Sequence, residues 1–268
     1  MTQQQGSKGY ALITGASSGI GAIYADRLAR RGYDLILVAR REDRLRELAG
    51  RITAGTGRAV ETVAADLGER ASLAKVEAIL RDDARITLLV NNAGTASIQP
   101  LLAAEVDEMS DMIALNVDAL TRLSYAAAPG FVRRGSGTLI NIASVVAIAP
   151  EVLNGVYGAS KAYVLAFSRS LRSELADKGV RVQVVLPGAT ATDIWANAGR
   201  RLEDMPKEIL MSTDQMVDAA LAGLDLGEFA TIPALPELAD WDKFEQARQV
   251  LMPNLSLAEP AARYRQGA

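Results

Sequence analysis

The 268-residue sequence contains neither histidine nor cysteine, and these two absences exclude several kinds of active site. Without cysteine the chain has no disulfide, no thiolate nucleophile and no cysteine-based zinc site. Without histidine it has no Ser-His or Cys-His nucleophile pair, and we expect no metal in the site. Proton transfer at neutral pH must therefore depend on tyrosine, lysine or carboxylate side chains.

Excess positive charge and long apolar runs are also lacking. The net charge is -3, which offers no basic field for nucleic acid, so we expect small neutral or anionic ligands instead. The opening stretch MTQQQGSKGY has no apolar signal-peptide core, and no apolar run reaches membrane-spanning length. We therefore expect a cytoplasmic protein with no membrane segment.

What is present is an alternation of short apolar runs with longer amphipathic segments, from residue 8 to about 187. Amphipathic helical patterns separate the short runs, which have the length and character of strands buried on both faces of a parallel sheet. These runs are YALIT, YDLILVA, AVETVAAD, ITLLVNN, GTLINIAS and VRVQVVLP. The pattern predicts an α/β fold, a Rossmann-type doubly wound parallel sheet of about seven strands with helices on both faces. No linker or repeat divides the chain, so we expect one domain over 1–268.

The last eighty residues have a different pattern. A loop with short helices over about 189–226 is expected to form a substrate-binding lid, with a helix near 213–226 and a short strand after it. A C-terminal tail follows over about 233–268, in which prolines bracket a helix near 238–252.

A glycine-rich turn, TGASSGIG, follows the first apolar run and opens a helix. Gly15, Gly19 and Gly21 let the backbone approach a pyrophosphate, and the helix N-terminus supplies unpaired N–H groups. The turn predicts a dinucleotide site, although the same glycines could form a tight turn without a ligand.

The end of the second run, LILVARRE, bears on the choice of dinucleotide. An acid here would favour NAD(H), but Ala39 is followed by Arg40 and Arg41, and an arginine fork suits a 2′-phosphate. We expect NADP(H) to be preferred, with Arg40 as the main contact and NAD(H) still possible. The alternative is that both arginines only solvate a helix start.

Tyr157 and Lys161 stand four residues apart in the largely apolar stretch NGVYGASKAYVLAF, on one face of a predicted helix. A phenol has a pKa near 10, and a nearby ammonium and the cationic nicotinamide ring should lower the pKa of Tyr157. Taken alone, such a pair is usually an incidental surface contact.

The ordered set of motifs resembles the classical short-chain dehydrogenase/reductase family. The set comprises TGASSGIG at 14–21, NNAG at 91–94, Asn116 in ALNVDAL, Ser144 in NIASVVA, YGASK at 157–161 and PG at 187–188. The similarity runs from residue 8 to about 230, in the family's order and spacing.

The resemblance implies a role for each matching residue. Tyr157 would be the acid or base, Ser144 would hydrogen-bond the substrate oxygen, Lys161 would hold the nicotinamide ribose, and Asn116 would anchor a relay water. Including Arg40 from the charge argument, the expected cofactor contacts are Gly15, Ser17, Ser18, Gly19, Ile20, Gly21, Arg40, Asp66, Leu67, Asn92, Ala93, Gly94, Tyr157, Lys161, Pro187, Gly188, Thr190 and Thr192. Asp66 would contact the adenine, although it could instead be a helix N-cap.

The expected substrate is a neutral, fairly apolar ketone or secondary alcohol, because the loops after the strands carry few charges. Their apolar residues are Ile98, Val146, Ile148, Val152, Leu153, Ile194 and Trp195, the last of which could instead pack the lid onto the core. The resemblance also implies a homodimer or homotetramer through the helices near 107–133 and 154–178. Two rival functions remain at this point: an NADP(H)-binding sensor without turnover, and a methyltransferase, which would not need the Tyr and Lys pair.

Overall fold

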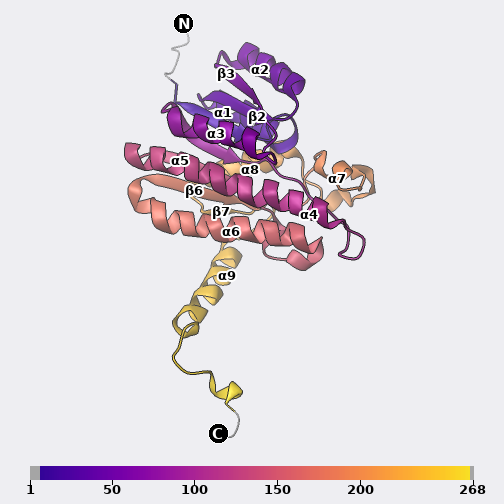
Figure 1. The fold of residues 1–268 in the computed structure, drawn as a ribbon, viewed down its shortest axis with the longest axis vertical. Helices are drawn as coiled ribbons and strands as arrows, with labels where there is room; N and C mark the ends of the chain where they lie inside the picture. The colour runs from indigo at the N-terminus through magenta and orange to yellow at the C-terminus, as the bar shows by residue number, and fades with distance from the viewer. Residues whose placement is uncertain (1–6, 266–268) are drawn as a thin grey trace. The chain divides into compact units, whose positions relative to one another are not determined.

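Seven parallel strands form one sheet in the order β3-β2-β1-β4-β5-β6-β7 (Figure 1). The structure, a computed structural model, describes residues 7–265. The strands are β1 (Tyr10–Thr14), β2 (Asp34–Ala39), β3 (Val60–Ala64), β4 (Ile86–Asn91), β5 (Gly137–Ile142), β6 (Val180–Val185) and β7 (Ala230–Thr231). The order reverses direction between β1 and β4, which is where open α/β sheets bind ligands at their carboxyl edge. The predicted doubly wound fold is confirmed.

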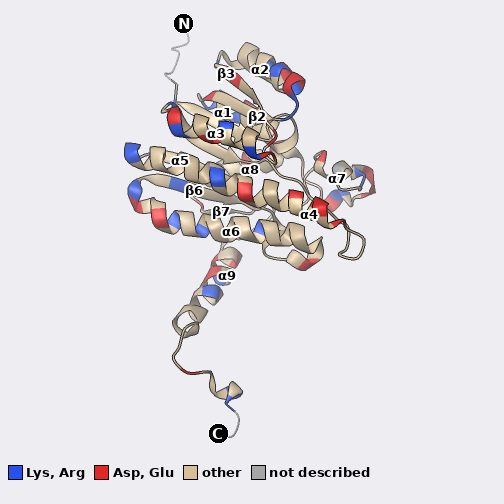
Figure 2. Cartoon of the chain, viewed as in Figure 1, with Lys and Arg blue, Asp and Glu red and all other residues tan. Residues whose placement is uncertain are grey.

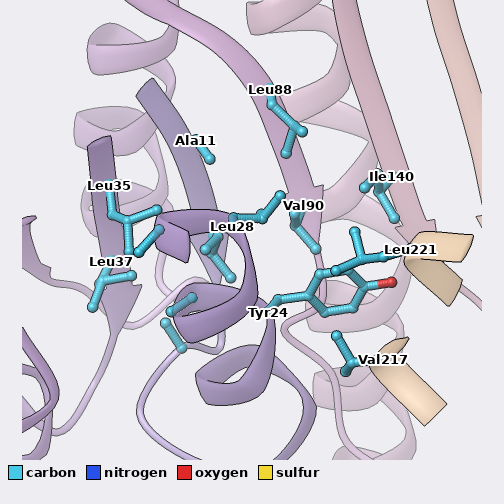
Figure 3. Close-up of a cluster of buried hydrophobic side chains, with 14 of the residues drawn as sticks. Ala11, Tyr24, Leu28, Leu35, Leu37, Leu88, Val90, Ile140, Val217 and Leu221 are labelled. Atoms are coloured by element: carbon cyan, nitrogen blue, oxygen red, sulfur yellow. The ribbon is translucent and has the colours of Figure 1, made fainter. Parts of the chain in front are cut away.

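Helices cover both faces of the sheet. The α-helices are α1 (Gly19–Arg30), α2 (Glu42–Thr56), α3 (Arg70–Asp82), α4 (Val106–Ile113), α5 (Leu120–Arg134), α6 (Gly155–Leu175), α7 (Ile194–Asn197), α8 (Thr213–Leu226) and α9 (Leu238–Leu251). Buried side chains of α1, α2 and α8 form one core against the sheet, part of which is drawn in Figure 3. Those of α3, α5 and α6 form a second core on the other face.

The strands are apolar because both faces are covered. Five of the six residues of β2 are buried, and so are the last four of β1, β4, β5 and β6. Several helices end on a glycine in the left-handed region, as α2 does at Gly57 with φ +70°. Since these stops and runs are local sequence features, the elements form close to where the apolar periodicity predicts them.

The helix expected near 107–133 is instead built of three parts. α4 ends at Ile113, a π-helical segment covers Ala114–Ala119, and α5 begins at Leu120. A π segment inserts an extra residue into a helical turn and is frequent at functional sites. Asn116 lies in its middle, so the irregular turn falls at one of the predicted catalytic residues.

The contacts within the chain divide it at Pro233 into two compact units, the second being 234–268. Within that second unit, α9 is followed by short 3₁₀ turns at Met252–Asn254 and Ala262–Tyr264. The expectation of a single domain over 1–268 stays a prediction. Within the described residues, no helix is both long and apolar enough to cross a membrane.

Candidate active site

The predicted site residues gather where the strands reach their carboxyl ends. Loops that follow β1, β4, β5 and β6 carry, in turn, the glycine turn, the NNAG segment, Ser144 and the Pro187–Gly188 pair. Parallel strands bring these loops to one edge of the sheet, although they are up to 170 residues apart in the chain. The fold itself therefore assembles the site.

The glycine turn is shaped by steric limits as well as by backbone freedom. Gly15 and Gly19 have φ of +65° and +53°, a region that L side chains rarely adopt. A Cβ at Gly21 would lie 2.5 Å from the carbonyl oxygen of Gly15, so only glycine lets α1 start this close to the turn. Ser18 is the N-cap of α1, but its side chain makes no capping hydrogen bond. The first-turn N–H groups at Gly19, Ile20 and Gly21 are therefore available to an anion.

Thr14 and Asn92 hold this turn against β4. The Thr14 hydroxyl accepts the backbone N–H groups of Asn92 and Ala93 at 2.9 and 3.0 Å. The Asn92 side-chain amide donates to the carbonyl of Thr14 at 2.8 Å and to that of Gly15 at 3.3 Å. Asn92 and Ala93 thus fix the turn through main-chain contacts.

Arg41, which sequence reasoning placed second to Arg40, is the arginine that reaches the glycine turn. Its guanidinium donates to the hydroxyls of Ser18 and Ser17 at 2.9 and 3.3 Å. Arg40 points elsewhere: its guanidinium lies 3.8 Å from the carboxylate of Asp66, and its side chain is 76% exposed. A cation beside two serine hydroxyls and a helix N-terminus is the donor set that a phosphate group needs.

Asp66 follows β3 and forms a local turn. Its carboxylate accepts the backbone N–H of Gly68 at 2.9 Å, while the N-cap of α3 is Glu69. The alternative reading of Asp66 as a helix N-cap is therefore wrong, because the chain makes one more turn before the helix begins. The neighbouring Leu67 is buried in the core under α3.

Tyr157, Lys161 and Ser144 meet next to the end of β5. The ammonium of Lys161 lies 5.9 Å from the centroid of the Tyr157 ring and donates to the carbonyl of Ile142 at 3.0 Å. The Ser144 hydroxyl donates to the carbonyl of Pro187 at 3.3 Å, and its interaction with the Tyr157 phenol lowers the pKa of that phenol. All three side chains are buried, between 6% and 8% exposed. The pair is therefore not an incidental surface contact.

Burial shifts both titrating groups of this set. It raises the pKa of the Tyr157 phenol, and the hydrogen bond with Ser144 only partly opposes it. It lowers the pKa of Lys161 to about 8. The expectation of a lowered Tyr157 pKa is wrong for the protein's own side chains, because the loss of hydration outweighs the neighbouring groups. The same expectation included the positive charge of the nicotinamide ring as a second cause of a lowered Tyr157 pKa, and that charge belongs to the cofactor.

Asn116 links the loop after β4 to α6. Its side-chain amide donates to the Thr95 carbonyl at 2.9 Å and the Ser160 hydroxyl at 3.1 Å, while its oxygen accepts the N–H of Thr95 at 2.9 Å. A Cβ at Gly94 would lie 3.0 Å from that oxygen and 3.6 Å from the Lys161 ammonium. Glycine at 94 therefore lets the Asn116 oxygen and the Lys161 ammonium approach the backbone closely. Ser160 is a member of the site that sequence reasoning missed, although it lies within YGASK.

The segment after β6 returns over the glycine turn. Thr190 is buried and bridges to Met211, and the methyl of Thr192 would lie 3.2 Å from a Cβ at Gly19. The indole N–H of Trp195 donates to the Thr190 carbonyl at 2.8 Å, so Trp195 braces the start of the lid. Gly188 has open space where a side chain would stand. The segment expected to form the lid thus begins next to the glycine turn.

These features define an α/β protein with a helix start that lacks a side-chain cap and with a buried Tyr, Lys and Ser set at one sheet edge. The family model described as short chain dehydrogenase matches residues 9–203. The chain belongs to the short-chain dehydrogenase/reductase family of oxidoreductases, as the motifs predict.

Solved structures of relatives are similar over nearly the whole chain. A short-chain dehydrogenase from Sphingobium yanoikuyae, in complex with NADPH, is 50% identical with a TM-score of 0.93, covering 96% of this chain and 100% of its own. The bulky-bulky ketone specific alcohol dehydrogenase from Comamonas testosteroni is 42% identical with a TM-score of 0.88, covering 96% and 98%.

Curated relatives match over a shorter region. The very-long-chain 3-oxoacyl-CoA reductase of Anas platyrhynchos is 36% identical over 68% of this chain, and the match spans only 60% of the duck enzyme. Sulfoacetaldehyde reductase 2 of Chromohalobacter salexigens is 38% identical over 68% of this chain and 73% of that enzyme. The relatives therefore differ widely in the compounds they are named for.

Proposed function

We propose that the protein is an NADP(H)-dependent oxidoreductase that transfers a hydride between nicotinamide and a neutral, fairly apolar ketone or secondary alcohol. The observation that supports this proposal most strongly is that Tyr157, Lys161 and Ser144 are buried together, at the sheet edge that also carries the glycine turn. The cofactor supplies the hydride when bound. The residues proposed to hold the cofactor lie in the loops after the strands and at the start of α1: Gly15, Ser17, Ser18, Gly19, Ile20, Gly21, Asp66, Leu67, Asn92, Ala93, Gly94, Pro187, Gly188, Thr190 and Thr192.

In reduction, the Tyr157 hydroxyl donates a proton to the substrate oxygen, and in oxidation the phenolate accepts it. Ser144 donates a hydrogen bond to the same oxygen and stabilises charge that develops on it. Lys161 holds positive charge near the ring, which favours phenolate, and holds the nicotinamide ribose. Asn116 keeps Thr95 and Ser160 in place around Lys161; its relay water stays a prediction.

A preference for NADP(H) over NAD(H) is supported by the charges around the adenosine end of the site. Arg41 contacts Ser17 and Ser18, Arg40 lies next to it, and Ala39 occupies the place where an acid would favour NAD(H). The structural relative at 50% identity was solved with NADPH. We extend the predicted 2′-phosphate site from Arg40 to include Arg41.

An apolar substrate is supported by the side chains around Tyr157. The ring packs with buried apolar side chains from the loop after β4, from α4 and from the loop after β5, and Lys161 is the charged side chain described beside it. Among the relatives, the enzyme specific for bulky-bulky ketones agrees best with such surroundings. We therefore favour a ketone whose carbonyl carries apolar groups on both sides.

The rival function, an NADP(H)-binding sensor without turnover, is disfavoured by the intact polar set. Asn116, Ser144, Tyr157 and Lys161 are all present and buried, and a sensor does not need a buried lysine that destabilises the fold. A methyltransferase on a related sheet would not need the Tyr and Lys pair.

A homodimer or homotetramer is also proposed, through the outer faces of α5 and α6. Tyr125 is 68% and Tyr163 37% exposed, and the Phe167 ring stacks between them at centroid distances of 6.2 and 5.6 Å. Figure 2 shows the first half of α6 almost entirely without charge. Such a surface suits self-association. The cytoplasmic location stays a prediction of the sequence.

A panel of ketones and alcohols, read by NADPH and NADH absorbance, tests the function directly. Turnover of apolar ketones with NADPH is expected; a protein that binds NADPH and turns over no carbonyl compound would support the sensor instead. Tyr157→Phe should retain NADPH binding and lose nearly all turnover. The exposed Tyr125→Phe is the matched control.

Cofactor choice is tested by binding rather than turnover. Arg41→Ala should weaken NADPH binding at least about tenfold and leave NADH binding within about twofold, since a hydrogen-bonded charge contributes about 1.5–3 kcal/mol. Arg51→Ala, an exposed arginine of the same helix α2, is the control. Equal weakening of both cofactors by Arg41→Ala would refute its role in selection.

A further inference from the structure

A third apolar cluster lies apart from the two cores that pack on the sheet. Its buried members are Ala96, Met109, Met112, Val146 and Tyr157, with the partly buried Ala104, Leu153, Val156 and Ile194 packed against them. They come from the loop after β4, from α4, from the loop after β5, from the start of α6 and from the lid. None of these residues lies in a strand or belongs to either core on the sheet, and Tyr157 is itself a member, so the cluster packs beside the Tyr157 side chain.

Two methionines of α4 form one side of this cluster. Met109 and Met112 are 8% and 2% exposed and stand three residues apart, on the same face of the helix. Asn116 follows four residues later in the π-helical turn and faces Ser160, one turn of α6 from Tyr157. The same face of this helical stretch therefore carries first the two methionines and then the polar anchor.

The chemistry places a substrate substituent against this cluster. A carbonyl oxygen that reaches both the Tyr157 and Ser144 hydroxyls brings its carbon next to the Tyr157 ring, so the groups on that carbon must contact what surrounds the ring. Methionine is unbranched and flexible, and such side chains adapt to ligands of different size. Among the buried members beside Tyr157, Ala96 is small and Val146 is stiff, so the two methionines are the adaptable buried side chains of the cluster.

We propose that Met109 and Met112 form an adaptable wall of the substrate site and determine how large a second substituent the ketone can carry. This inference rests on the proposed function and adds to it the residues that set the size limit. The substrate class is then a ketone with two large apolar substituents, in which one lies along α4.

The test compares two ketones that differ only in one alkyl group, acetophenone with a methyl and hexanophenone with a pentyl. Met112→Phe adds volume and stiffness, and it should lower kcat/KM for hexanophenone at least about tenfold while that for acetophenone changes less than about threefold. Most of the change should appear in KM, because binding space is lost and the proton-donating groups are unchanged. In Met109→Leu and Met112→Leu the side-chain volume is nearly kept, but leucine is stiffer than methionine. Both variants should lower the ratio of kcat/KM for hexanophenone to that for acetophenone, by a smaller factor than Met112→Phe.

Met216→Leu is the matched control, because Met216 is fully buried on α8 and belongs to a core on the sheet rather than to the cluster of Tyr157. This variant should leave the ratio of the two kcat/KM values, for hexanophenone and acetophenone, unchanged. Thermal melting and NADPH binding establish that each variant is folded, and the two leucine variants decide the question if Met112→Phe does not fold.

The outcomes separate this inference from the proposed function. If the wild-type protein reduces neither ketone with either cofactor, the proposed function is wrong and the wall has no substrate. If the wild type is active but the α4 variants change both ketones by the same factor, the function stands and the assignment of Met109 and Met112 is overturned.

Discussion

Lys161→Met should make the protein more stable and inactive at the same time. Lys161 is 6% exposed, and its pKa falls from the ordinary 10.5 to about 8 because burial penalises the ammonium. Methionine has a similar length and no charge, so it fits the same space without that penalty. The prediction therefore separates the lysine's function from any contribution to folding.

The expected change in the free energy of unfolding follows from the pKa shift of Lys161. Lowering the pKa from 10.5 to about 8 corresponds to about 3 kcal/mol by which the buried charge destabilises the fold near pH 7. The variant also loses the hydrogen bond from Nζ to the Ile142 carbonyl, which contributes about 1 kcal/mol. A net gain of about 2 kcal/mol remains, which for a chain of this size corresponds to a rise in Tm of about 4–8 °C.

The assay is urea unfolding of the cofactor-free protein between pH 7 and pH 10.5, with the exposed Lys178→Met as control. Because the folded pKa of Lys161 lies below its unfolded value, the penalty is complete below pH 8 and disappears as the pH rises toward 10.5. The stability advantage of Lys161→Met should therefore be largest at pH 7 and close over that window. A variant that is less stable than wild type at pH 7, or an advantage that does not change with pH, would refute the reasoning.

Three further changes test other parts of the structure. Tyr24→Phe should be neutral or raise the Tm slightly in thermal melts, because the Tyr24 hydroxyl is buried without a hydrogen-bond partner; a loss above about 1 kcal/mol would contradict this. Gly94→Ala should weaken NADPH binding measured by calorimetry while the Tm stays within about 2 °C, since its Cβ would fill the space 3.0 Å from the Asn116 oxygen. For Glu77, burial raises the pKa, but the hydrogen bonds from Arg122 and Arg81 outweigh it, so the net pKa is lowered. Glu77→Gln should accordingly lose about 2 kcal/mol in urea unfolding at pH 7, a difference that shrinks as the pH falls below 4.5; a constant difference would argue against the ion pair as its cause.

The fold could be predicted from the sequence because its signals are local. Strands buried on both faces must be apolar throughout, and runs such as DLILVA of β2 show this without any knowledge of their neighbours. The division of the stretch near 107–133 could not be predicted in the same way. The residue types of a π-helical turn do not differ from those of an α-helix. Asn116 in this turn makes hydrogen bonds with Thr95 and Ser160, which are distant in the sequence.

The sequence named side chains that the structure brings together, but it predicted their electrostatics only in part. Motif spacing named Tyr157 and Lys161, yet the direction of the Tyr157 pKa depends on burial, which no spacing reveals. Motif spacing also does not reveal which of Arg40 and Arg41 reaches the glycine turn. One residue of difference at the end of β2 decides whether the guanidinium reaches Ser18 or Asp66, and that depends on how α2 leaves the strand.

The helical stretch of α4 and the π-helical turn connects the proposed size limit for the substrate with the hydrogen bonds around Lys161. The face of α4 that packs Met112 against the Tyr157 cluster continues into the turn where Asn116 anchors Thr95 and Ser160 around Lys161. Any change of side-chain volume on that face therefore acts on a helix that ends in the hydrogen-bond network of Asn116. A substitution that moves α4 as a body should alter kcat for every ketone, whereas one absorbed locally by a flexible side chain should alter only KM for the large ones. The flexibility of methionine at these positions is what allows the size limit to change while the polar anchor stays fixed.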